Sequence, residues 1–181
     1  MSEKKLGLIV NPVAGMGGSV GLKGTDGMVE EAVRRGAVPH AGERAALALK
    51  ALLPLKEELI VLCASGKMGE TIAKELGFRV QVVYTCTPES SASDTISAAK
   101  AMQDADLILY VADSSRVLDE SDEEILKLLE GKKALVLLNK SDLDTVITAQ
   151  VMRERTGDPV LVISAEEGAG IQELEEKIRS L

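Results

Sequence analysis

Aromatic residues are scarce in this sequence of 181 residues: they make up 2% of it, and tryptophan is absent. An aromatic stacking platform for single-stranded nucleic acid is therefore excluded, and the core must be aliphatic. The two cysteines, Cys63 and Cys86, and the one histidine, His40, are too few for a disulfide scaffold or a Cys/His zinc cluster. We accordingly expect no metal site.

Positive charge and long apolar runs are also in short supply. Lys and Arg total 21 against 29 Asp and Glu, which gives a net charge of −8. The field of such a chain repels phosphate, so nucleic acid and anionic membranes are excluded as partners. No unbroken apolar run exceeds six residues, the length of Leu107–Ala112, whereas a membrane helix needs about twenty. No basic-then-apolar leader opens the sequence. We expect a cytoplasmic protein, monomeric or an adventitious dimer formed through an exposed sheet edge.

Six short apolar runs alternate with amphipathic stretches. The runs are apolar on both faces, which is typical of strands buried on both sides of a parallel sheet. The stretches between them carry apolar residues at three-and-four spacing, which indicates helices. This pattern predicts an α/β fold: a single three-layer αβα doubly wound domain over residues 1–181, Rossmann-like, with a six-stranded parallel sheet in the order 3-2-1-4-5-6. The predicted strands are Leu6–Val10, Leu59–Cys63, Val80–Tyr84, Leu107–Ala112, Ala134–Leu138 and Val160–Ile163.

The most specific motif is an Asn-Lys-Ser-Asp turn at residues 139–142, after the fifth predicted strand. Its Asp carboxylate can accept two parallel hydrogen bonds, from the ring N–H and the exocyclic amine that only guanine presents together. The Lys stem can lie flat over the purine, and the Asn can tie neighbouring loops together. After the next strand, Ser164-Ala165 can offer a backbone N–H to the guanine carbonyl. The alternative is a polar turn that caps the following helix. The two motifs together favour a guanine-base site formed by Asn139, Lys140, Asp142, Ser164 and Ala165.

A glycine-rich stretch over residues 11–27 follows the first predicted strand. Glycines in that position often let backbone N–H groups approach a phosphate. The candidates for such an anion-binding loop are Gly15, Gly17, Gly18 and Gly21. The stretch matches neither the P-loop pattern G-x-x-x-x-G-K-[ST] nor the dinucleotide fingerprint G-x-G-x-x-G. The favoured interpretation is therefore a mobile loop that binds no ligand.

Two family resemblances divide the sequence. From about residue 5 to 102 it resembles the N-terminal part of the ATP-NAD kinase-like family, through residues 7–18, 21–27, the turn at 68–70 and the segment 87–98. From about residue 104 to 181 it resembles the C-terminal half of the P-loop GTPase domain of the MnmE family of tRNA-modification GTPases. That likeness runs through residues 106–115, 118–120, 135–143, 163–165 and 168–174. It implies base-recognition roles for the five residues of the predicted guanine site.

Both resemblances lack the parts that carry catalysis. The Gly-Gly-Asp-Gly-Thr turn of the kinase-like family is replaced by Ala112-Asp-Ser-Ser115. The sequence also lacks the elements that serve phosphoryl transfer in the GTPases: the P-loop lysine and serine, the switch threonine and the Asp-x-x-Gly motif. We therefore hypothesise a chimera, recombined or engineered, of a kinase-like half (1–103) and a GTPase-derived half (104–181) that has no catalytic residues. The alternative is a weak guanine-nucleotide-binding module. No cofactor is expected beyond weakly bound GDP or GTP.

Overall fold

A computed structural model describes most of the chain, and every structural statement below concerns these residues. They are 3–10, 16, 20–22, 28–39, 41–86, 92–114, 117–118, 120–139, 141–142, 144–164 and 167–180.

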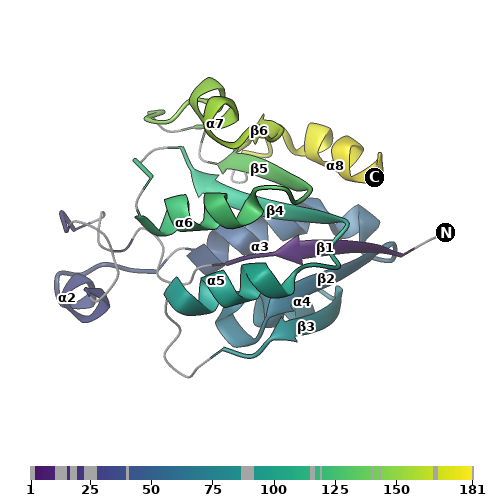
Figure 1. Ribbon diagram of the computed structural model, residues 1–181, viewed down its shortest axis with the longest axis horizontal. Coiled ribbons are helices and arrows are strands. Elements are labelled where there is room, and N and C mark those ends of the chain that lie inside the picture. Colours follow the sequence, from purple (N-terminus) through teal and green to yellow (C-terminus); the bar gives the residue numbers. More distant parts are fainter. Residues whose placement is uncertain are drawn as a thin grey trace.

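Six strands form one sheet in the order β3-β2-β1-β4-β5-β6, and every pairing between them is parallel. This confirms the predicted α/β fold and its strand order (Figure 1). The chain crosses back to the centre of the sheet between β3 and β4, so β1 and β4 are neighbours there. The strands are β1 (Lys4–Leu8), β2 (Leu59–Ala64), β3 (Arg79–Tyr84), β4 (Leu107–Asp113), β5 (Ala134–Asn139) and β6 (Val160–Val162).

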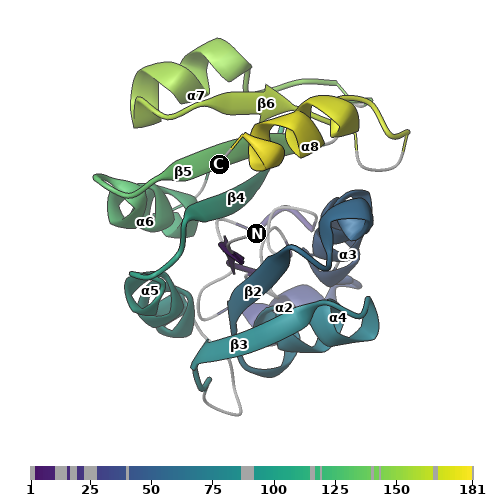
Figure 2. The ribbon, with the colours of Figure 1, turned by 90° about the vertical axis from the view of Figure 1, so that its right-hand side faces the viewer.

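Helices cover both faces of the sheet, as Figure 2 shows. The apolar cluster on one face joins strand residues to α3, α4 and α8, and the cluster on the other face joins them to α5, α6 and α7. A smaller helix, α2, lies off the sheet, beyond the carboxyl end of β1 (Figure 1). The helices are α2 (Val29–Arg34), α3 (Ala41–Ala51), α4 (Glu70–Glu75), α5 (Ala92–Ala101), α6 (Glu120–Leu129), α7 (Ala149–Thr156) and α8 (Ile171–Arg179), with short 3₁₀ turns at Leu53–Leu55 and Gly66–Met68.

The core is aliphatic on both sides because successive strand residues point to opposite faces. All six residues of β5, at the middle of the C-terminal part of the sheet, are buried. Leu135 and Leu137 join the cluster under α3 and α8, while Val136 and Leu138 join the one under α5, α6 and α7. This alternation explains why the run reads as uniformly apolar in the sequence.

Residues on either side of position 103 share this one sheet. β1 pairs with β4 in the register Leu6↔Leu107 to Leu8↔Leu109. The Asp106 carboxylate accepts a hydrogen bond from the Lys5 backbone N–H at 2.7 Å, and the Asp106 N–H donates to the Lys5 carbonyl at 2.8 Å. At Gly7, an added Cβ would lie 3.1 Å from the Met102 sulfur, so the central strand packs closely against the crossover.

Among the helices described here, none is long and apolar enough to cross a bilayer.

Candidate functional site

Polar residues gather at the carboxyl ends of β4, β5 and β6. These three strands are neighbours, and in open α/β sheets ligands bind at this edge. Asn139 is the last residue of β5, is 3% exposed and is paired in the ladder with Asp113 at the end of β4. Ser164 follows β6 and is 1% exposed. The fold therefore brings the two predicted guanine motifs to one edge.

Asp142 and Ser164 are in direct contact although 22 residues separate them. The Ser164 hydroxyl donates to Oδ1 of Asp142 at 2.6 Å, and Ser164 Oγ accepts from the Glu167 N–H at 3.1 Å. A second link joins the same segments, because the Ser141 N–H donates to the Ile163 carbonyl at 3.2 Å. The Asp142 side chain is exposed. Ser164 thus orients the carboxylate of an exposed residue, which can accept further hydrogen bonds from a ligand.

Two glycines shape the loop that carries Ser164. Gly168 and Gly170 have φ values of 78° and 74°, a region in which side chains other than hydrogen are strained. A Cβ on Gly170 would lie 2.5 Å from the Val162 carbonyl oxygen, whereas nothing lies within 4 Å of one on Gly168. Gly170 is therefore needed for the close approach of this loop to β6. The sequence showed the Gly168-x-Gly170 spacing but not this contact.

Ser114 is a further site residue that the sequence did not single out as functional. It follows β4 and is 1% exposed. Its N–H donates to the Asn139 carbonyl at 3.0 Å, and its carbonyl accepts from Val146 and Ile147 at 2.8 and 3.0 Å. These bonds fix both ends of the loop that contains Asp142. A polar residue at the carboxyl end of a buried strand was the available signal.

Several predicted site residues lie outside the described part of the chain. They are Lys140 and Ala165 of the guanine site and Gly15, Gly17 and Gly18 of the glycine-rich loop. Gly21 is described and has a φ of 76° with open space around its Cβ position. The anion-loop hypothesis therefore remains a prediction.

Sulfur-bearing side chains lie at the carboxyl ends of β2 and β3. Cys63 is fully buried, and this burial raises the pKa of its thiol to about 12. A thiol with that pKa stays protonated near neutral pH and is a poor nucleophile. The Cys86 thiol donates to the Met68 sulfur at 3.1 Å.

The nearby Glu70 carboxylate accepts hydrogen bonds from Lys74 and from the Gly66 N–H, and these lower its pKa. Within the described ranges, no three His, Cys, Asp or Glu side chains are grouped to hold a metal.

The fold and this edge define a class: a Rossmann-like α/β protein with a serine-oriented carboxylate at the carboxyl ends of its C-terminal strands. Comparison with curated proteins then points to the tRNA modification GTPases MnmE. The protein from Lachnoclostridium phytofermentans is 33% identical over 165 residues, which cover 85% of this chain and 35% of that protein. The one from Clostridioides difficile is 44% identical over 78 residues, 42% of this chain and 17% of that protein. The one from Thermotoga sp. is 29% identical over 134 residues, 68% of this chain and 30% of that protein.

These matches support the predicted similarity of the C-terminal half to MnmE. The chain spans about a third or less of the length of these relatives. Residues 104–181 are 78 of the 181 residues, so a match over 85% of the chain extends well into residues 1–103. No family model matches the chain. The comparisons support neither the ATP-NAD kinase-like resemblance nor a chimeric origin.

Proposed function

We propose that the chain is a guanine-nucleotide-binding module that recognises the base through Asp142 and its neighbours. The observation that carries this proposal is the 2.6 Å hydrogen bond from Ser164 to Oδ1 of Asp142. It holds the carboxylate in one orientation before a ligand arrives, and preorganisation of this kind favours binding. The similarity to MnmE, whose name describes a GTPase, supports the same ligand class.

In this proposal Asp142 accepts hydrogen bonds from the ring N–H and the exocyclic amine of guanine. Both bonds are charge-assisted, which makes them stronger than neutral ones. The aliphatic stem of Lys140 covers one face of the purine, and the Ala165 N–H donates to the guanine carbonyl. Asn139 is buried at the end of β5 and holds the neighbouring loops together. Adenine has a ring-nitrogen acceptor and a C–H at the corresponding positions. It therefore offers the carboxylate no hydrogen-bond donor and is not recognised.

We further propose that binding is weak and that no hydrolysis follows. The sequence contains no G-x-x-x-x-G-K-[ST] stretch and no Asp-x-x-Gly stretch. Those elements hold the phosphates and magnesium in P-loop GTPases. A base held by two charge-assisted hydrogen bonds and stacking alone corresponds to a dissociation constant of about 1 mM. A non-catalytic chimeric scaffold would also show no hydrolysis. We favour the base-binding module because the match to MnmE extends across residue 103, where the two halves of the hypothesised chimera would join.

A nuclear magnetic resonance titration of the full chain with guanosine, GMP and GDP tests the proposal. We expect changes in amide chemical shift centred on Asn139, Asp142 and Ser164. The three ligands should bind with similar affinities because the protein contacts only the base. Asp142→Ala should weaken guanosine binding at least about tenfold, equivalent to about 1.4 kcal/mol. The matched control is Asp144→Ala, which removes an exposed carboxylate two residues away. Absence of shifts at about 10 mM guanosine, some ten times the expected constant, would refute the proposal.

A further inference from the structure

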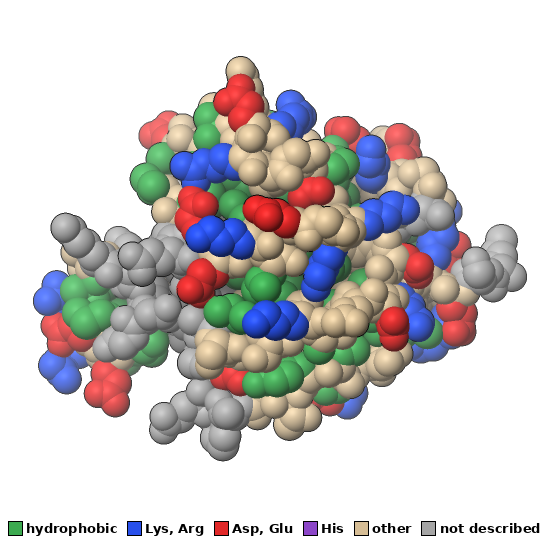
Figure 3. All heavy atoms as spheres, in the orientation of Figure 1, with side chains coloured by type: hydrophobic (Ala, Val, Ile, Leu, Met, Phe, Trp, Pro, Cys, Tyr) green, Lys and Arg blue, Asp and Glu red, His purple; other side chains and the backbone are tan. Residues whose placement is uncertain are grey.

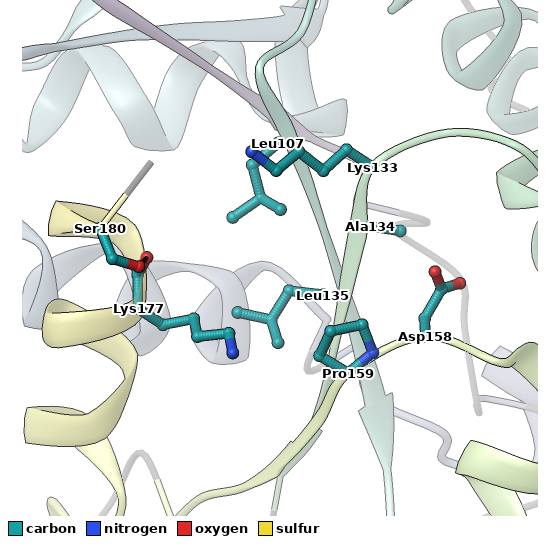
Figure 4. A pocket seen from close by; sticks show the side chains of 8 residues that line it. All are labelled: Leu107, Lys133, Ala134, Leu135, Asp158, Pro159, Lys177 and Ser180. Carbon is teal, nitrogen blue, oxygen red and sulfur yellow. Dashed lines mark hydrogen bonds between the residues drawn. The ribbon is translucent and has the colours of Figure 1, made fainter.

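A cavity of about 250 Å³ opens at the edge of the sheet opposite the base site (Figure 4). It lies at the amino ends of β4, β5 and β6, beside the last turn of α8. Its floor is made of core residues, because Leu107, Ala134 and Leu135 are each 4% exposed or less. Pro159 forms one wall. A ligand here would meet an apolar surface continuous with the core.

Two unpaired ammonium groups border this floor. Lys133 precedes β5 and Lys177 lies on α8, and in the described part of the chain neither ammonium forms a hydrogen bond or an ion pair. In Figure 4 their side chains run toward Leu107 and Leu135. The chain is acidic overall, with a net charge of −8, but both of these lysines are exposed, so the anionic group of a ligand can reach two ammonium groups that have no carboxylate partner among the described residues.

The one carboxylate in the lining does not neutralise these lysines. In Figure 4 the Asp158 side chain lies at the right, near Ala134 and Pro159, whereas both ammonium groups lie at the left. Partial burial raises the pKa of Asp158, which fits a carboxyl group that has no cation beside it. The Ser180 hydroxyl is already used, since it donates to the Lys177 carbonyl at 2.7 Å. The lining therefore has a cationic side, at Lys133 and Lys177, that is separate from the Asp158 carboxyl group.

We propose that this cavity binds a small organic carboxylate with a compact apolar body. The carboxylate lies between Lys133 and Lys177, and the apolar body covers Leu107, Leu135 and Pro159. An inorganic phosphate would leave the floor exposed to water, and a neutral apolar molecule would leave both ammonium groups unpaired. The volume is below the usual range of about 300–1,000 Å³ for sites that hold drug-sized ligands, so a fragment-sized acid fits best.

The test titrates benzoate into the full chain and follows backbone amides by nuclear magnetic resonance. We expect shifts at Leu107, Ala134, Leu135 and Ser180. Benzamide has the same shape without the charge and should bind about fivefold to tenfold more weakly, the effect of losing two exposed ion pairs. The double variant Lys133→Gln/Lys177→Gln should weaken benzoate binding by the same factor.

The control is Lys100→Gln/Lys127→Gln, which changes the net charge equally on the exposed surface of α5 and α6. The proposal fails if benzoate produces no shifts at this edge up to about 20 mM, if benzamide binds as tightly, or if both double variants have the same effect. Guanosine binds at the opposite edge and should leave these four amides unshifted. Failure here is thus distinguishable from failure of the base site.

Discussion

At the residue scale, Gly170 lies where only a hydrogen atom fits between the loop after β6 and the strand itself. Its φ is 74°, and a Cβ there would lie 2.5 Å from the Val162 oxygen and 3.0 Å from a methyl group of Ile163. The loop that follows Ser164 closes on itself, because Ser164 N–H donates to the Ala169 carbonyl at 3.1 Å. A shift of Gly170 would therefore be passed to Ser164 and from there to Asp142.

We predict that Gly170→Ala destabilises the fold by roughly 1–3 kcal/mol, the usual range for a strained backbone position, and weakens guanosine binding. Urea unfolding measures the first effect and guanosine titration the second. Gly168→Ala is the matched control, since Gly168 shares the positive φ but has nothing within 4 Å of its Cβ position. It should lose less stability and little affinity. Equal losses in the two variants would show that the contact with β6 has no role.

At the element scale, two strands are fastened to the helices that follow them by the same kind of hydrogen bond. The Tyr84 hydroxyl on β3 donates to Oδ1 of Asp94 in the first turn of α5 at 2.9 Å. The Tyr110 hydroxyl on β4 donates to Oδ1 of Asp122 in α6 at 2.6 Å. Both aspartates are buried and lie near helix amino termini, where negative charge is favoured. Each tyrosine thus fixes the start of a helix against its strand.

We predict that Tyr110→Phe costs roughly 1–3 kcal/mol of stability, because the ring stays but the buried Asp122 carboxylate loses a donor. Thermal and urea unfolding measure the loss. A double-mutant cycle with Tyr110→Phe, Asp122→Asn and the double variant isolates the coupling energy between these two side chains. A coupling energy near zero, or an unchanged unfolding midpoint in Tyr110→Phe, would contradict this role.

Periodicity predicted the elements well, because strands buried on both sides and helices buried on one face leave different apolar patterns. Gly77 and Gly131 follow the ends of α4 and α6, with φ values of 80° and 76° that glycine adopts without strain. The boundaries were less accurate. The first strand runs from Lys4 to Leu8 rather than from Leu6 to Val10, since the pairing of Lys4 and Lys5 with β2 depends on a neighbour that local sequence does not reveal.

At the scale of the whole molecule, residues that are far apart in sequence meet to hold one sheet together. Besides the β1–β4 pairing, the Lys4 ammonium donates to the Ile178 and Arg179 carbonyls at 3.3 and 2.9 Å, which ties β1 to the end of α8. Charges of both signs are interspersed over the face shown in Figure 3, so the residues described on that face form no large area of one charge.

The sequence located the base site only in part, and the reason is physical. Motif spacing predicted that Asp142 and Ser164 would share an edge, since both follow neighbouring parallel strands. It could not show that they are hydrogen-bonded, that Ser114 braces the loop or that Gly170 touches β6, because these contacts depend on how the loops fold back over the strands. The roles of Lys140 and Ala165 remain predictions.

The most direct test of the central claim is the base preference of Asp142→Asn. An asparagine accepts from the ring N–H but donates where the carboxylate accepted, so it matches the C2 carbonyl of xanthine rather than the amine of guanine. Isothermal titration of the full chain should show wild type preferring guanosine over xanthosine by at least about tenfold, and Asp142→Asn reversing that order. Equal affinity of wild type for the two nucleosides, or an unchanged preference in the variant, would contradict base recognition by Asp142.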